Sequence, residues 1–391
     1  MKEYNAENCY LGTAKFVMKF LGVWLPMENE RYYRKIHRTI TLSTQYLFLL
    51  FQIIDIIRVF GDLEAVSQAS YILFTQACLV FKITLFLATK NSLRLLLEQM
   101  NSQVFMPQST EQERILKLQA SKIKRLLLAF AVSSQATCGM WALKPLFDDA
   151  GEREFPFRMW MPVGTEKSLE YIVGYAFQLL SVCTSAYIYF GVDSVALCMV
   201  IFGCAQLDVI KDKIVKIKPV TMEDRAAKRA LNIFKDNYKI LVECIIQHQK
   251  IVKFTERIEN TYHTYLLFQL SGGVGLICMS ALRILVVDWQ SMQFFSIITY
   301  LSVMIMQMYV CCWCGHELTA HSEELYWVLS EGPWYEQSVQ FQRALCFTML
   351  RMRRPMVFRA GHYVPLSRQT FVSILRMSYS YFALLRQTHK N

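Results

Sequence analysis

The chain has 391 residues, of which 54% are hydrophobic, 14% are aromatic and only 19% are charged. Soluble proteins carry charge on about a quarter of their residues, and one of this length would be expected to divide into domains joined by polar linkers, which this chain lacks. The net charge of +11 does not indicate nucleic-acid binding, because the basic residues lie between apolar segments, so the composition predicts a membrane protein.

Seven apolar segments are long enough to cross a bilayer, since about 20 helical residues span its hydrocarbon core. The fourth exceeds one crossing and is expected to continue as a helix beyond the membrane. The seventh is the least hydrophobic and has Arg376 near its middle, so we expect it to face protein or water rather than lipid. The expected spans are residues 37–60, 66–89, 125–146, 170–203, 263–287, 293–314 and 367–387.

These spans predict a single all-α, polytopic domain over residues 1–391. The expected parts are a cytoplasmic or interfacial N-terminus at 1–36, four membrane helices in 37–206, a helical extension at 207–262, two membrane helices in 263–314, a second extension at 315–366 and a last helix in 367–391. No cleavable signal peptide is expected before the first span, because the N-terminal region is charged and mixed.

The distribution of Lys and Arg predicts which side of the membrane each loop faces. The N-terminal region and the loops at 90–125, 207–260 and 315–366 carry 31 Lys and Arg residues, whereas the alternate loops carry three. Basic loops stay in the cytoplasm, so the N-terminus is expected inside and the C-terminus outside. This orientation is the reverse of that of a G-protein-coupled receptor.

The stretch "YVCCWCGHEL", residues 309–318, raises the possibility of a zinc site, because Cys311, Cys314 and His316 are potential ligands. A structural zinc site needs four ligands, and the chain has no second CxxC. The preceding run, "FFSIITYLSVMIMQMYVCCWC", carries no charge. We therefore interpret the cysteines as packing residues at the inner end of the sixth span, with palmitoylation as an alternative, and expect no metal or cofactor.

Several C-terminal motifs then identify a family. These are "CWCGHELTAHSEELYWVL" at the end of the sixth span, "GPWYE" at 332–336, "FTMLRMRRP", and "PLSRQTFVSILRMSYSYFALLRQ" in the last helix. They resemble the pattern of the insect odorant receptor family, and the chain's length and layout are similar throughout, although only the part from Gly315 onward is specific. The chain looks like an odour-tuning subunit, because it lacks the co-receptor's long insertion between the fourth and fifth spans.

The resemblance implies a function in the plasma membrane of a sensory-neuron dendrite. Members are odorant-gated, non-selective cation channels in which a tuning subunit forms a heterotetramer with a shared co-receptor, held together by the cytoplasmic extensions. The last helix lines the pore, which would place the gate at Leu384, with Gln387 and Thr388 just outside it. These three residues can share one helix face, at spacings of three and four residues. Arg386 departs from such a lining and is expected to point toward lipid headgroups.

The resemblance also implies an odorant pocket in the outer half of the second, third, fourth and sixth spans. Mainly aromatic residues there, with a few hydroxyls and amides, would suit a small volatile with one or two polar atoms. The candidate ligand-binding residues are Tyr71, Phe74, Thr75 and Cys78; Thr137, Met140 and Trp141; Tyr171, Tyr175 and Gln178; and Phe294, Ile297 and Tyr300.

Three alternatives remain open on the residues alone. A gustatory receptor of the same superfamily is the nearest, although Ser380-Tyr381 and Gln387-Thr388 match only half of that family's closing motif. A G-protein-coupled receptor would need the opposite orientation. An enzyme or transporter is not expected, because the chain has no HExxH, no acidic pair within a span and no inverted repeat.

Overall fold

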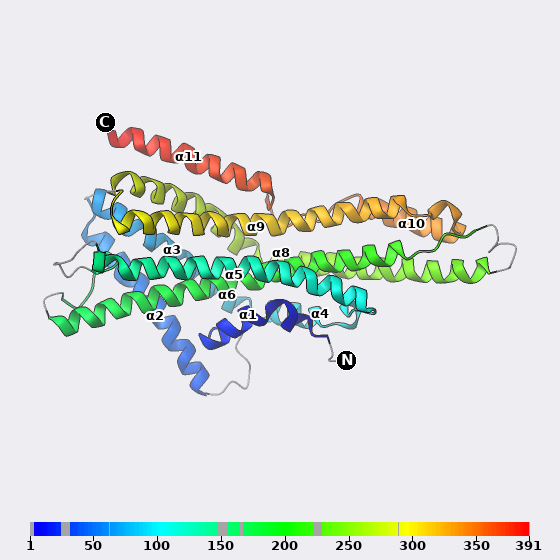
Figure 1. The fold of residues 1–391 in the computed structure, drawn as a ribbon, viewed down its shortest axis with the longest axis horizontal. Helices are drawn as coiled ribbons and strands as arrows, with labels where there is room; N and C mark the ends of the chain where they lie inside the picture. The colour runs from blue at the N-terminus through cyan, green and yellow to red at the C-terminus, as the bar shows by residue number, and fades with distance from the viewer. Residues whose placement is uncertain are drawn as a thin grey trace.

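The computed structural model describes residues 4–24, 32–61, 63–147, 155–164, 167–221, 229–287 and 289–390. They form an elongated helical bundle with one short hairpin (Figure 1). The elements are α1 (Ala6–Phe20), α2 (Tyr32–Arg58), α3 (Leu63–Ala88), α4 (Lys90–Met100), η1 (Gln103–Phe105), α5 (Thr110–Phe147), α6 (Ser168–Val215), α8 (Ala230–Val286), α9 (Met292–Glu331), η2 (Trp334–Glu336), α10 (Val339–Met352), β1 (Arg359–Ala360), β2 (Val364–Pro365) and α11 (Arg368–Lys390).

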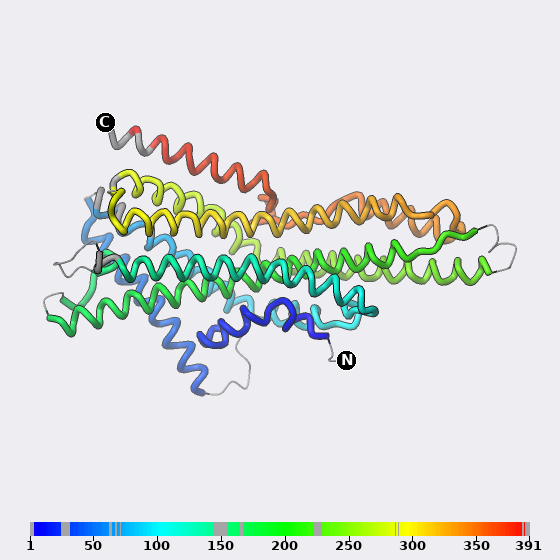
Figure 2. The backbone as a smooth tube through the Cα atoms, in the orientation of Figure 1, coloured from blue at the N-terminus to red at the C-terminus, as the bar shows by residue number. Residues whose placement is uncertain are grey.

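Each predicted span lies within one helix, to within two residues at either end, and four of these helices are much longer than one bilayer crossing requires. The expected spans correspond to α2, α3, α5, α6, α8, α9 and α11. Helices α5, α6, α8 and α9 have 38, 48, 57 and 40 residues, about twice what a bilayer requires. The extra turns of α6, α8 and α9 form the long arm on the right of Figure 2, and the expected continuation of the fourth span is confirmed.

Five described helices are long and apolar enough to cross a membrane: α2, α5, α6, α8 and α9. Helix α3 joins them only together with α4, from which it is bent by 67°. Helix α11 does not meet the same criteria, as expected from its weak hydropathy. The fold class is therefore confirmed as an all-α, multi-pass membrane protein, whereas the orientation of its termini stays a prediction.

Helix α6 is the centre of the bundle, and its residues from Ile188 to Leu207 are all buried. Helices α1, α3, α5, α8 and α9 pack against it. Helix α1 is held there by Tyr10, whose hydroxyl donates to the Leu116 carbonyl at 2.8 Å and whose ring packs edge-on against Phe202 with centroids 5.4 Å apart. The N-terminal segment thus contributes to the core, whereas its position at the membrane surface stays a prediction.

The entry into α11 is fixed by the β1–β2 hairpin, which packs on α8. Gly361 has a φ of +60°, a conformation that favours glycine, and its N–H donates to the His263 carbonyl at 2.9 Å. Just before α11, the backbone at Leu366 crosses α9 directly at Gly315. A Cβ atom on Gly315 would lie 2.7 Å from the Leu366 carbonyl oxygen. Only glycine permits this close approach between two backbones.

Replacing Gly315 by Ala should therefore displace the start of α11 and destabilise the receptor by about 1–3 kcal/mol, because the obstructing atoms include backbone that cannot move cheaply. The measurement is the melting temperature of the detergent-solubilised protein together with its surface expression. Gly275→Ala is the matched control, since a Cβ there meets nothing within 4 Å. Equal behaviour of the two variants would show that the contact does not constrain α11.

Candidate functional site

A small, mostly apolar cavity of about 70 Å³ lies between α2, α3, α5, α6 and α9. It is close to the segment at 155–164, since the Trp141 ring in its wall packs edge-on against Phe157 with centroids 5.0 Å apart. The lining residues are Phe48, Ile72, Thr75, Gln76, Phe130, Ser134, Thr137, Cys138, Trp141, Val182, Ser185, Ala186, Tyr189, Tyr300, Val303 and Met304.

Four of the candidate ligand-binding residues line this cavity: Thr75, Thr137, Trp141 and Tyr300. The hydroxyls of Thr75 and Tyr300 are hydrogen-bonded to each other across α3 and α9. The Trp141 and Tyr300 rings pack with centroids 5.7 Å apart. The structure therefore brings together one candidate residue from α3, two from α5 and one from α9.

Three candidate residues of α6 instead lie near the outer segment above the cavity. The Gln178 side chain binds both the N–H and the carbonyl of Phe157, at 3.0 and 3.2 Å. Tyr175 donates to the Ala142 carbonyl at 2.5 Å, and Tyr171 stacks on Phe155 with centroids 5.6 Å apart. Gln178 and Tyr171 thus hold the 155–164 segment over the bundle, whereas Tyr175 joins α6 to α5.

The remaining candidates lie outside the lining. Phe74 is half exposed, Ile297 is buried, and Phe294 packs edge-on against Phe295. The Met140 sulfur accepts a hydrogen bond from Thr299 at 3.6 Å. Cys78 lines a second, smaller cavity directly below the first. Tyr71 belongs to α3, but its side chain lies outside the described residues.

One wall of the cavity is polar and had not been expected. Gln76 donates to the Gln45 side-chain oxygen at 2.8 Å, and the Ser185 hydroxyl lies 2.6 Å from that oxygen and 3.0 Å from the Gln76 oxygen. All three side chains are buried, and Gln76 and Ser185 line the cavity. Two glutamines inside apolar spans are a sequence signal for this cluster, because amides in lipid require partners.

A buried ion pair lies beneath the cavity. The Lys82 ammonium contacts both carboxylate oxygens of Asp193, at 3.0 and 3.3 Å, and Gln307 donates to the same carboxylate. The ammonium also lies 4.3 Å from the ring centroid of Tyr189, which contributes to the cavity wall. Lys82, Asp193 and Gln307 join α3, α6 and α9 in the plane of the membrane.

The candidate gate lies on the exposed part of α11. Near its start, α11 packs on α9 through Phe371 and Tyr309, whose ring centroids are 5.5 Å apart, and it buries Ile374. Leu384 is 58% exposed and Gln387 is also exposed, whereas the side chain of Thr388 lies outside the described residues. The end of α11 therefore diverges from the rest of the subunit (Figure 1), as a helix that faces other subunits would.

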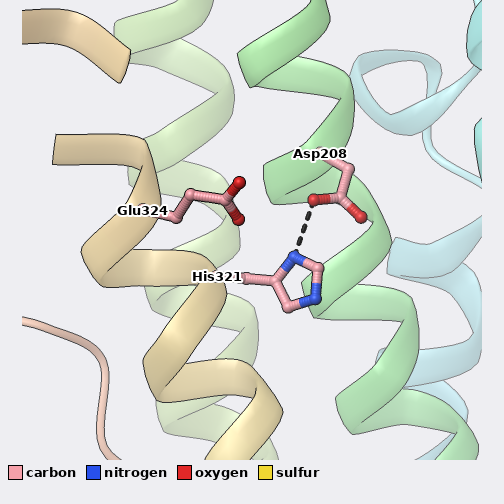
Figure 3. A group of neighbouring side chains, drawn as sticks. All are labelled: Asp208, His321 and Glu324. Carbon is pink, nitrogen blue, oxygen red and sulfur yellow. Dashed lines mark hydrogen bonds and ion pairs between the residues drawn. The ribbon is translucent and has the colours of Figure 1, made fainter. Parts of the chain in front are cut away.

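Outside the predicted spans, Asp208 of α6 meets His321 and Glu324 of α9 (Figure 3). The three groups could hold a metal ion, but the Lys211 ammonium already occupies the space between them. It lies 2.9 Å from Asp208 and 3.3 Å from His321, and it forms an ion pair with Glu324. We interpret the cluster as an ion-pair network between two helices.

His321 is protonated at neutral pH in this network. Burial alone would lower its pKa, but hydrogen bonding to Asp208 at 2.6 Å and the nearby Glu317 carboxylate raise that pKa to about 9. The Asp208 pKa is lowered, because His321 and Lys211 outweigh the effect of its burial. Glu317 in turn forms an ion pair with Arg368 at the first residue of α11, at 3.5 Å. The network therefore joins α6, α9 and α11.

The three cysteines of the stretch at residues 309–318 are packing residues, as the sequence indicates. Cys311, Cys312 and Cys314 are each at most 2% exposed and lie in the main hydrophobic core. Their burial also makes palmitoylation of these thiols a poor fit. His316 is partly exposed and lies in α9 beyond the end of the predicted sixth span.

The helices, the membrane-capable segments and the apolar cavity define a multi-pass, all-α membrane protein with room for a small ligand. The model of the family described as 7tm Odorant receptor matches residues 62–379, and the chain belongs to that family. It is accordingly an odorant receptor subunit. The expected family is thus confirmed.

The relatives have similar length and the same fold. The chain is 21% identical to Odorant receptor Or1 of Anopheles gambiae, over 94% of this chain and 93% of that protein. It is 24% identical to Odorant receptor 46a, isoform A, of Drosophila melanogaster, over 98% of each. Its fold is also that of the olfactory receptor OR5 from Machilis hrabei, solved in complex with eugenol, with a TM-score of 0.81 and 14% identity over 97% of this chain and 98% of that one.

Replacing Lys82 by Met should sharply reduce stability and surface expression, because it leaves Asp193 charged and buried. Breaking a buried pair from one side typically costs about 3–5 kcal/mol. The double variant Lys82→Met, Asp193→Asn should recover much of the loss, as measured by surface labelling and melting temperature. A double variant no better than Lys82→Met would contradict a direct interaction between the two side chains.

The His321 network predicts a loss of stability at alkaline pH. Because the folded-state pKa of about 9 exceeds the usual 6.5, protonated His321 stabilises the fold fully below pH 6.5, by roughly 3 kcal/mol, and this is lost as the pH rises through 9. The melting temperature of the solubilised receptor should fall over that range. His321→Gln should melt lower than wild type at neutral pH and lose most of this pH dependence. An unchanged pH profile in the variant would exclude His321 as the titrating group.

Proposed function

We propose that the chain is the odour-tuning subunit of an odorant-gated, non-selective cation channel, formed as a heterotetramer with the olfactory co-receptor. It would act in the plasma membrane of a sensory-neuron dendrite, with its N-terminus in the cytoplasm. The observation that carries the proposal is the apolar cavity between five helices, roofed by the 155–164 segment. The family membership of the chain supports its use as an odorant site.

The chemistry of the cavity suits a small volatile. Its walls are mostly aromatic and aliphatic, with few polar groups. These are the Thr75–Tyr300 pair, the Gln76–Ser185 pair, the hydroxyls of Ser134, Thr137 and Tyr189, and the Trp141 indole N–H. An apolar molecule with one or two oxygen atoms would match this balance. At about 70 Å³ the cavity is small, so side chains such as Met304 must move when a ligand enters.

Helix α9 supplies a direct connection between ligand and gate. Tyr300 and Met304 contribute to the cavity, and Tyr309, a few turns further along the same helix, contacts Phe371 of α11. A ligand opens the channel only to the extent that it binds the open conformation more tightly. We infer that the ligand favours a displaced α9, which moves the base of α11 and opens a hydrophobic constriction at Leu384.

The test is whole-cell recording from cells that express the chain with and without an insect olfactory co-receptor, while G-protein signalling is blocked. A panel of volatiles should evoke a rapid cation current that requires both subunits. Epitope tags at the two termini should show an internal N-terminus. Responses abolished by the G-protein block, or an external N-terminus, would contradict the channel proposal.

Two substitutions, each with a matched control, test which residues form the ligand cavity and which form the gate. Ala186→Leu reduces the cavity, so the effective concentration of active volatiles should rise by roughly tenfold or more, whereas Ala176→Leu on the exposed face of α6 should change little. Leu384→Ser should raise the current without odorant, because a polar ring hydrates the constriction. Val372→Ser, nearer the base of α11, is its control. Unchanged resting current in Leu384→Ser would exclude this residue from the gate.

A further inference from the structure

A third hollow, of about 500 Å³, is larger than the two cavities described above. It lies between α1, α5 and α6, away from the Lys82–Asp193 pair. We call it the α1–α5 groove. Helix α1 contributes Tyr10 and Ala14 to its wall, and α6 contributes Phe190, Ser194 and Cys198, which lie on one helix face at intervals of four residues. The odorant cavity does not share any of these residues.

The chemistry of the groove changes along its length. On α5 it begins with Lys117, continues through Lys124 and Arg125, and ends at Leu127 and Leu128. These residues cover about 16 Å of helix at 1.5 Å per residue. Because α5 and α6 are antiparallel, Phe190 lies toward the apolar end and Cys198 toward the basic end. The groove is therefore basic at one end and apolar at the other.

Two of the three cations at the basic end have no partner among the residues that the structure describes. Lys117 forms an ion pair with Glu113 at 2.6 Å. Lys124 and Arg125, in contrast, make no hydrogen bond or ion pair with any residue that the structure describes. Two cations at the mouth of an apolar groove are suited to an anionic group that continues into a hydrocarbon chain.

A buried hydroxyl on the groove floor points to the same occupant. Ser194 is fully buried, yet its hydroxyl has no hydrogen-bond partner among the described residues. Ser185 and Ser280, also in membrane helices, instead donate to the carbonyl four residues earlier. An unpaired buried hydroxyl costs free energy, which a polar atom of a bound molecule would offset. The ester oxygens of a phospholipid lie between its headgroup and its chains, as Ser194 lies between the cations and the apolar wall.

We infer that the α1–α5 groove binds an anionic phospholipid of the cytoplasmic leaflet, with its phosphate at Lys124 and Arg125 and an acyl chain against Leu127, Leu128 and Phe190. The inference rests on the proposed orientation, which places the start of the third span, near residue 125, at the inner surface. The lipid fastens α1 to the bundle, because α1 forms one wall of the groove. It thus acts as a structural ligand distinct from the odorant.

The test uses the full receptor, purified with its co-receptor and reconstituted in nanodiscs of phosphatidylcholine containing either phosphatidylserine or phosphatidylinositol bisphosphate. Native mass spectrometry counts the retained lipids, and a photoactivatable anionic phospholipid maps the site. We expect retention of anionic lipid and cross-links to α5 and α6 along the groove. The double variant Lys124→Ala, Arg125→Ala should weaken retention roughly tenfold or more. Lys122→Ala, an exposed cation on the same helix outside the groove, is the matched control.

Each outcome decides the inference. If the double variant and Lys122→Ala lose the same amount of retained anionic lipid, the lipid is held only by general attraction to surface charge. That outcome would overturn the proposed site. Binding of a soluble inositol phosphate as tight as that of the lipid would overturn the acyl-chain contact, and cross-links confined to other helices would overturn the location. Thr13→Trp, on the exposed rim, should block retention without altering the cations, and failure to do so would also contradict it.

Odour-evoked current is recorded in parallel to separate this inference from the proposed function. Lipid retained in the groove of a receptor that shows no cation current with any volatile would contradict the channel proposal alone. A normal current in a receptor that retains no anionic lipid would contradict the groove alone.

Discussion

Burial of the middle of α6, from Ile188 to Leu207, is the constraint from which the rest of the structure follows. A charged group in such a segment cannot reach water, so it must be satisfied by a neighbouring helix. Asp193 meets this requirement with Lys82 of α3 and Gln307 of α9. Three helices are thereby held at one level, and the cavity above and the smaller cavity below both form against this fixed plane.

Helix α9 carries this arrangement out of the membrane. From Tyr300 at the cavity it continues through Gln307 at the ion pair and Tyr309 at α11 to His321 in the ion-pair network. A single continuous helix transmits a displacement better than separate segments joined by loops. The base of α11 is held by α9 at three points: the ring contact of Phe371, the backbone contact at Gly315 and the Arg368–Glu317 ion pair. The end of α11 makes fewer contacts within the subunit and can therefore move relative to its base.

The sequence predicts the membrane helices well, because the requirement for a long apolar run is independent of neighbouring helices. Depth within the membrane stays a prediction, and four of the thirteen residues assigned to the outer half line the cavity. Rotation about the helix axis is different. Thr75 lines the cavity whereas its neighbour Phe74 is half exposed, and Trp141 lines it whereas Met140 does not. Each residue turns the side chain by about 100°, and only packing against other helices fixes which neighbour faces inward.

Polar residues in apolar spans carried more information than the aromatic residues did. Aromatic side chains are common throughout membrane helices and contribute to packing everywhere, so their presence does not distinguish a pocket wall from a helix contact. An amide or charge in a span must have a partner. Gln45, Gln76, Lys82 and Asp193 accordingly mark the helix surfaces that face one another.

The two hollows on either side of α6 differ in the property that determines which molecule each can hold. The proposed odorant cavity has no cationic side chain among the described residues that line it, so a ligand there gains little from carrying a negative charge. The α1–α5 groove has cations at its mouth and an unpaired hydroxyl on its floor. A neutral volatile leaves those groups unsatisfied, whereas an anionic lipid satisfies them. We infer that the same chain can be surrounded by charged lipid and still respond to uncharged molecules, because cationic side chains line one hollow and not the other.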